Sequence, residues 1–172
     1  CSGFDRAAIA ARALQAMADA VGAPAGAVYA CEEDPPRLVP IASRALPTPA
    51  AALGDGEGLP GRAAREGRVV LERGIPPDSP WRLKLGVDEL PPRSVVAVPA
   101  MLGEEALGVV VLAAPGEFDE VALELLASAS IQLALGLNNA RSHVRLREKN
   151  ERIQAQSEEL QAQREELQAQ SE

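Results

Sequence analysis

The chain has 172 residues, of which 47% are hydrophobic and 2% are aromatic, and its formal net charge is −8. This length suits about one compact domain, and its core must be built from Ala, Val and Leu because aromatic side chains are scarce. The negative charge opposes binding to nucleic acid or to an anionic membrane surface, so we expect neither partner.

Cysteine content and the lack of targeting signals indicate a cytoplasmic location. Two cysteines, Cys1 and Cys31, are too few for a disulfide framework, which favours a reducing compartment. There is no signal peptide, and no uninterrupted apolar run approaches the roughly 20 residues that span a bilayer. We expect no membrane contact by this chain. The sequence ends inside a repeat, so we interpret the chain as a piece of a longer protein. That longer protein could be anchored in a membrane through another of its segments.

The first predicted elements are a helix and a β-hairpin. Residues 4–21 place apolar side chains at helical spacing and are followed by Gly22 and Pro24, which predicts an amphipathic helix. Residues 27–31 and 38–45 are typical of two strands joined by a turn.

Glycines open the next stretch. Residues 60–66 form a predicted short helix with Gly67 as its C-terminal stop, and residues 68–72 form a predicted short strand. Residues 74–93 are proline-rich and carry Trp81, the only tryptophan. A loop of this length inside a domain is usually functional or mobile.

Residues 94–101 and 107–114 form the most apolar predicted hairpin. Pro99 fits a central strand badly, which predicts a bulge or an irregular strand end. Asp119 is placed to cap a final helix. Strands joined as hairpins, with helices at both ends, predict an α+β domain with an antiparallel sheet.

The last third of the chain predicts one long helix. Residues 119–172 contain no proline and one glycine, Gly136, and as a helix they would run on the order of 80 Å. Residues 121–137 are apolar on nearly every side, so they need a second covering surface besides the sheet.

The end of this helix has one large apolar residue in every seven, namely Leu146, Ile153, Leu160 and Leu167. This spacing predicts a coiled coil over residues 144–172, following a domain over residues 1–143. If these residues take the d positions, the a positions are Asn150, Ser157 and Arg164. The upstream apolar stripe, which ends at Val144, is then out of phase, which predicts a local break in the coil. A solvated helical linker is the open alternative.

Several stretches in this order resemble a GAF domain. Residues 56–70 are similar to its middle helix and following strand, residues 94–100 with 107–112 to its central hairpin, and residues 118–126 to the start of its last helix. Residues 75–93, followed by a coil rich in Gln-Glu-Glu-Leu, resemble the GAF domains of bacterial sensor histidine kinases, often hybrid ones. The resemblance implies a GAF/PAS-like antiparallel sheet flanked by helices.

GAF domains bind small ligands between one face of the sheet and the loops that cover it. By that resemblance the candidate pocket residues are Tyr29, Cys31, Trp81, Met101 and Arg93. A closed, structural pocket, with Trp81 as a lid over the core, is the open alternative. We expect no metal and no cofactor, because the only histidine, His143, lies beyond the domain and two cysteines cannot complete a zinc or iron–sulfur site. No catalytic constellation is visible, so we do not expect this fragment to be an enzyme.

The resemblance implies a regulatory sensor module of a two-component histidine kinase. In this interpretation a parallel homodimer passes a conformational signal through its coiled coil to kinase domains downstream in the same chains. The alternatives are a GAF domain that regulates a cyclase, phosphodiesterase or phosphatase, and a structural dimerisation module without ligand. The interface candidates are Leu123, Leu133, Leu137, Val144, Leu146, Ile153, Leu160 and Leu167.

Overall fold

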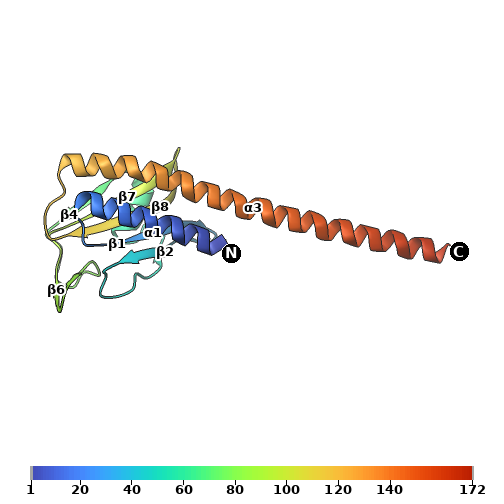
Figure 1. The fold of residues 1–172 in the computed structure, drawn as a ribbon, viewed down its shortest axis with the longest axis horizontal. Coiled ribbons are helices and arrows are strands. Elements are labelled where there is room, and N and C mark those ends of the chain that lie inside the picture. The colour runs from blue at the N-terminus through green and yellow to red at the C-terminus, as the bar shows by residue number, and fades with distance from the viewer. Residues whose placement is uncertain (1, 172) are drawn as a thin grey trace. The chain divides into compact units, whose positions relative to one another are not determined.

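Antiparallel hairpins build a six-stranded sheet with the strand order β3-β2-β1-β8-β7-β4 (Figure 1). The computed structural model describes residues 2–171, in two units that meet after Asn138. The sheet strands are β1 (Ala25–Glu33), β2 (Pro36–Arg44), β3 (Leu53–Gly54), β4 (Val70–Arg73), β7 (Ser94–Leu102) and β8 (Glu105–Ala114). The helices are α1 (Ser2–Val21), α2 (Gly58–Glu66) and α3 (Glu120–Gln170). The predicted α+β class, with flanking helices and a long C-terminal helix, is confirmed.

Local sequence signals set the ends of these elements. Gly67 ends α2 with a φ of 63°, and its N–H donates to the carbonyl of Ala63 at 2.9 Å, as the predicted helix stop requires. Asp119 caps α3, because its Oδ1 accepts a hydrogen bond from the N–H of Ala122 at 2.7 Å. Both predictions from sequence are confirmed.

The segment over residues 74–93 is more ordered than predicted. It contains a two-stranded hairpin, β5 (Leu83–Leu85) with β6 (Asp88–Leu90), whose turn includes Gly86 at a φ of 70°. The side chain of Leu83 is fully buried. The prediction of one long loop was therefore wrong, because a short strand pair anchored by one leucine carries too weak a pattern to separate from loop sequence.

Pro99 is tolerated because of its place in β7. Strand β4 pairs with β7 only as far as Ala97, so at Pro99 the strand has one neighbour, β8. The β7–β8 register then shifts between Ala100 and Met101. The predicted irregularity is confirmed, and it lies one residue beyond the proline.

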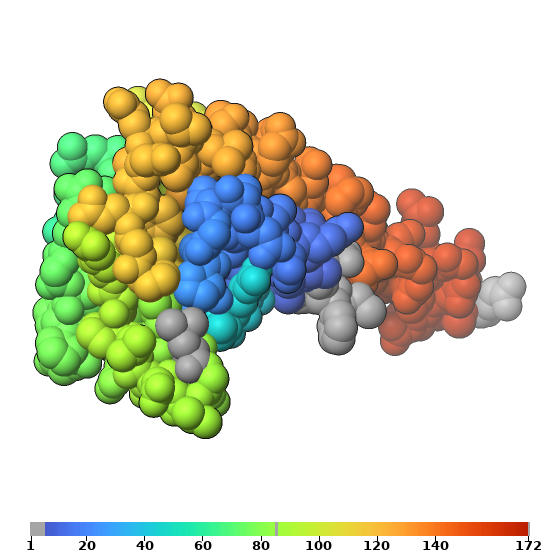
Figure 2. Space-filling view, turned by 60° about the vertical axis from the view of Figure 1, so that its left-hand side comes forward, coloured from blue at the N-terminus to red at the C-terminus, as the bar shows by residue number. Residues whose placement is uncertain are grey.

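The sheet separates two buried cores. On one face α1 and the first part of α3 cover the sheet, with Leu14, Met17, Leu126 and Leu133 among the buried side chains. Figure 2 shows these two helices next to each other on the surface. Gly136 allows their close approach, since a Cβ there would lie 2.9 Å from Cγ2 of Ile9. On the other face, α2 and the segment that carries β5 cover the second core.

The composition of α3 bears on membrane contact. Among the described residues it is the one helix long and apolar enough to cross a membrane by length and composition alone, a test that core helices of soluble proteins also pass. The composition-based exclusion of a membrane span therefore does not hold for this helix. The absence of membrane contact stays a prediction.

Leu126 connects α3 to the sheet, so its truncation tests that contact. We expect Leu126→Ala to lower the free energy of unfolding by about 2–5 kcal/mol, because it leaves a cavity between helix and sheet. Urea denaturation followed by circular dichroism measures the change. Val87→Ala, at the fully exposed tip of the β5–β6 hairpin, should change stability by less than about 0.5 kcal/mol. Equal effects of the two variants would contradict this packing.

Candidate functional site

The space expected for a ligand is filled by the chain's own side chains. Tyr29 of β1 and Trp81, which precedes β5, are both buried, and their ring centroids lie 6.3 Å apart at an interplanar angle of 76°. This edge-to-face contact is a favourable aromatic geometry. Leu83 is buried in the same core. Trp81 is therefore a lid over a packed core, which was the alternative left open by the sequence.

A hollow of about 370 Å³ remains at the rim of this face, where β1, β2, α2 and β8 meet. Its charged and thiol-bearing lining comprises Cys31, Glu32, Glu33, Arg37, Asp55, Arg65 and Glu105. Carboxylates outnumber guanidinium groups in this set, so the hollow does not favour an anionic ligand.

The floor of the rim hollow is a tight glycine loop. The Glu57 carboxylate accepts a hydrogen bond from the N–H of Gly54 at 2.7 Å. A Cβ on Gly61 would lie 2.4 Å from the carbonyl carbon of Gly56, so α2 and the loop touch backbone to backbone. The Arg65 guanidinium occupies the space where a Gly56 side chain would lie. These glycines allow the close packing of α2 against the loop.

The thiol of Cys31 is poorly suited to chemistry. Burial, together with the negative charges of Glu105 and Asp55, raises its pKa to about 11. The thiol therefore stays protonated near neutral pH, and the thiolate is the reactive form of cysteine. Burial also raises the pKa of Tyr29 to about 12. Both groups are neutral components of the second core and its rim.

The other two pocket candidates lie elsewhere, so the five predicted residues do not form one pocket. Arg93 is exposed, its Nε lies 3.7 Å from Oε1 of Glu117, and it borders a separate hollow beside Gly74. Met101 lies near Gly67 and lines a third hollow, which Ile131 of α3 also borders. Met101 comes directly after the β7–β8 register shift, where Leu107 of β8 has no partner in β7.

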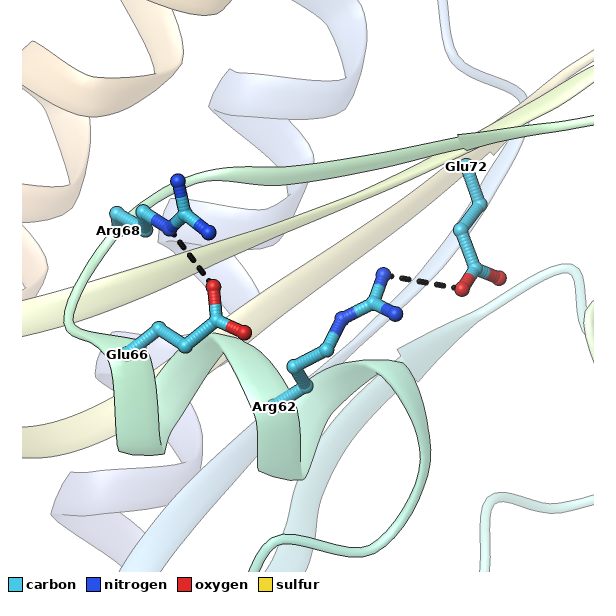
Figure 3. Close-up of polar contacts among 4 residues, drawn as sticks. All are labelled: Arg62, Glu66, Arg68 and Glu72. Carbon is cyan, nitrogen blue, oxygen red and sulfur yellow. Dashed lines mark hydrogen bonds and ion pairs between the residues drawn. The ribbon is translucent and has the colours of Figure 1, made fainter.

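Arginines on α2 and the following turn face solvent, and each has an acidic partner. Arg62 donates to Glu72 of β4 at 3.0 Å, and Arg68 donates to Glu66 at 2.7 Å (Figure 3). Exposed pairs of this kind contribute little to stability. Within the described residues, no three His, Cys, Asp or Glu side chains are grouped to hold a metal ion. The absence of metal and cofactor stays a prediction.

The interface candidates of α3 divide into two groups. Leu133 and Leu137 are 2% and 4% exposed and belong to the first core, and half-buried Leu123 packs against it. Leu133 and Leu137 face their own sheet, so their assignment to a dimer interface was wrong, whereas the interface role of Leu123 stays a prediction. Leu146, Ile153, Leu160 and Leu167 are exposed, Val144 is half-buried, and their interface role stays a prediction.

Sequence reasoning missed a set of exposed apolar residues at the start of α3, namely Val121, Leu125, Ile131 and Leu135. Leu135 is 44% exposed, although the buried Leu133 is only two residues away. The sequence shows an almost continuous apolar run here, and only burial separates its two faces.

Gly61→Ala tests the contact between α2 and the glycine loop. We expect a loss of about 1–3 kcal/mol in the free energy of unfolding, because the added methyl group must displace backbone atoms of Gly56. The matched control is Gly116→Ala, where an added Cβ would meet no atom within 4 Å. Thermal or urea unfolding measures both. A Gly61→Ala protein as stable as the control would contradict the backbone contact.

The raised pKa values of Cys31 and Tyr29 predict alkaline destabilisation. The ordinary pKa values of these groups are 9.0 and 10.0, and their pKa values in the folded protein are about 11 and about 12, so burial favours the neutral forms. The stability from Cys31 is present below pH 9 and is lost as the pH rises through 11. Urea unfolding from below pH 9 up to pH 11 should show falling stability, and Cys31→Ala should make the fall shallower. An unchanged slope in this variant would contradict the role of Cys31.

Comparisons with known proteins agree with this geometry. The family model described as "GAF domain" matches residues 5–138. No curated protein matches the sequence. The GAF domain of an Acinetobacter phosphoenolpyruvate-protein phosphotransferase is 24% identical, with a TM-score of 0.64 over 77% of this chain and 82% of that one.

Two further solved structures have a similar fold. The second GAF domain of DevS from Mycobacterium smegmatis is 17% identical, with a TM-score of 0.65 over 82% of this chain and 99% of that one. Free methionine-R-sulfoxide reductase from Neisseria meningitidis, solved with its substrate, is 21% identical, with a TM-score of 0.63 over 80% of this chain and 81% of that one. At these identities the likeness establishes the fold alone. Because the family model covers the sheet and its helices, this chain belongs to the GAF domain family.

Proposed function

We propose that this GAF domain is the regulatory module of a sensor histidine kinase, and that a parallel homodimer relays a conformational signal through α3 to downstream kinase domains. One observation carries the proposal: α3 is part of the domain core and continues as one helix to Gln170. Its buried residues include Leu126 and Leu133, which lie in the core that covers the sheet. A change in the packing of the sheet is therefore a change in the environment of the helix that carries the heptads.

The kinase assignment is supported by the sequence. Residues 75–93 and the Gln-Glu-Glu-Leu repeats resemble the GAF domains of bacterial sensor histidine kinases. Exposed leucines every seven residues, from Leu146 to Leu167, suit a coiled coil that joins two chains. We propose a cytoplasmic module that needs no cofactor and binds no nucleic acid, consistent with its net charge of −8.

A structural dimerisation module without ligand is the second candidate. It is favoured by the contact between Tyr29 and Trp81, which fills the face of the sheet where a ligand was expected. In this candidate the domain sets the spacing of two helices and senses nothing itself. A GAF domain that regulates a cyclase, phosphodiesterase or phosphatase would differ from the proposed kinase module in the catalytic domain that follows it.

The proposal predicts ATP-dependent phosphorylation of histidine in the full-length protein. A double variant, Leu125→Glu with Leu135→Glu, should be folded by circular dichroism but monomeric by sedimentation at a protein concentration on the order of tens of micromolar. It should lose the phosphorylation, because two charges would be buried in the interface. Val87→Glu, on the exposed hairpin tip, is the control and should leave the dimer and the activity unchanged.

Three results would contradict the proposal. Turnover of a cyclic nucleotide or a phosphate ester, in place of phosphohistidine, would assign the domain to another class of output. A wild-type protein that is monomeric at the same concentration would contradict the proposed homodimer. Full phosphorylation by the monomeric double variant would show that phosphorylation does not require the dimer.

A further inference from the structure

The start of α3 has two apolar stripes on opposite sides. One stripe is buried in the domain and consists of Leu126, Ser130, Leu133, Ala134 and Leu137. The other is exposed and includes Val121, Leu125 and Leu135. With 3.6 residues per turn, the centres of these two sets lie roughly opposite each other around the helix. The exposed stripe therefore faces away from the sheet that buries the first.

The exposed stripe shares one seven-residue frame with the leucines of the tail. Counting forward from Leu125 in steps of seven gives Gln132, Asn139, Leu146, Ile153, Leu160 and Leu167. A coiled-coil seam needs a second row of positions beside this one, either three residues later or four residues later. The first choice gives Ser128 and Leu135 as companions, and the second gives Ala129 and Gly136.

Burial decides between the two rows. Val121, Ser128 and Leu135, which belong to the first choice, are all exposed. In the second row, Ala122 and Ala129 pack against the first core, and Gly136 lies against Ile9 of α1. A residue that packs on its own domain cannot face a partner. In the seam, Leu125 and the residues that follow it in steps of seven therefore take the a positions of the heptad. Val121, Ser128 and Leu135 take the d positions.

We propose that this stripe binds a second copy of the chain, parallel and in register, with Leu125, Asn139 and Leu146 each facing its own counterpart. The proposal rests on the dimer of the proposed function and specifies its register. In the tail it assigns Lys149, Gln156 and Gln163 to the seam, in place of the predicted Asn150, Ser157 and Arg164. No break in phase is then needed, because the stripe that ended at Val144 is the one that faces the sheet.

Asn139 favours a second copy over other partners. A single asparagine at an a position selects a parallel, in-register pair, because each side chain can hydrogen-bond its own counterpart. An apolar surface such as lipid would leave the amides of Gln132 and Asn139 without partners. An identical helix supplies a matching amide at each of these layers.

The charges of the tail are compatible with this frame. Glu159 falls at g and Arg164 at e, the positions that form attractive pairs between parallel helices. The competing frame places Arg164 at a, opposite its own counterpart. The proposed frame places Lys149 at d, where its long side chain can carry the charge to the rim. Each frame thus has one lysine or arginine in the seam, and the exposed residues of the domain decide between the two frames.

Disulfide cross-linking tests the register in the full chain. In a background with Cys1→Ser and Cys31→Ser, we would compare Ser128→Cys, Gln156→Cys and Gln163→Cys with Ala129→Cys, Ser157→Cys and Arg164→Cys. Facing d positions bring two cysteines within disulfide range, whereas e positions do not. Mild oxidation should give mainly dimers for the first three variants and only background for the others. Val87→Cys, at the exposed hairpin tip, measures collisional background.

A second measurement does not depend on disulfide geometry. Asn139→Leu should tighten the dimer by on the order of tenfold or more in Kd, because it removes a polar layer from the seam. Asn150→Leu should leave Kd unchanged, because Asn150 lies at e in the proposed frame and at a in the competing one. Sedimentation equilibrium measures both.

The outcomes separate this inference from the proposed function. Cross-linking at Ser157→Cys and Arg164→Cys, or tightening by Asn150→Leu, overturns the register while the dimer stands. A monomer with only background cross-linking overturns both. A monomer that binds phosphatidylcholine vesicles through the same stripe, and loses that binding with Leu125→Glu, assigns the stripe to lipid and overturns the proposal.

Discussion

The packing of α3 against the sheet is the constraint on which the rest of the structure depends. Leu126, Leu133 and Leu137 belong to the core that α1 and the sheet complete. Protein interiors are close-packed, so this core has few ways to absorb a displacement of the sheet. The same contacts determine which residues of the helix stay exposed for a partner. A helix that packs one side against its own domain has only the opposite side available for another surface. Val121, Leu125 and Leu135 are exposed because the opposite side of α3 packs against the sheet.

The second core limits what this domain can sense. Tyr29 and Trp81 fill the face of the sheet that α2 and β5 cover, and Cys31 at its rim is held as a neutral thiol by burial and nearby carboxylates. The rim hollow is bordered by more carboxylates than guanidinium groups. A signal that reaches the domain without opening this core must act at the rim or at the helices.

Local chemistry made most of the fold predictable. The Gly67 helix stop, the Asp119 cap and the hairpin of β7 with β8 each depend on signals within a few residues. The candidate site was less predictable because it depends on distant relations. Met101 lines a hollow together with Gly67 and Ile131 of α3, and nothing near Met101 in sequence specifies that these distant residues meet there. The two sides of α3 were indistinguishable for a similar reason, since leucines such as Leu133 and Leu135 differ only in what covers them.

A seam with polar layers suits a relay better than a uniformly apolar one. In the proposed dimer, Leu125 and Leu146 flank a stretch whose seam positions include Gln132, Asn139 and Ser142. Apolar layers on both sides hold the chains together, whereas the polar layers between them contribute less to association and keep the register. Two arrangements of such a stretch can differ by only a few kcal/mol, and a signal from the domain then needs only that much differential stabilisation to change their populations. The opposite side of the helix packs in the core that covers the sheet. A change in that core therefore acts on the same helix that carries these polar layers.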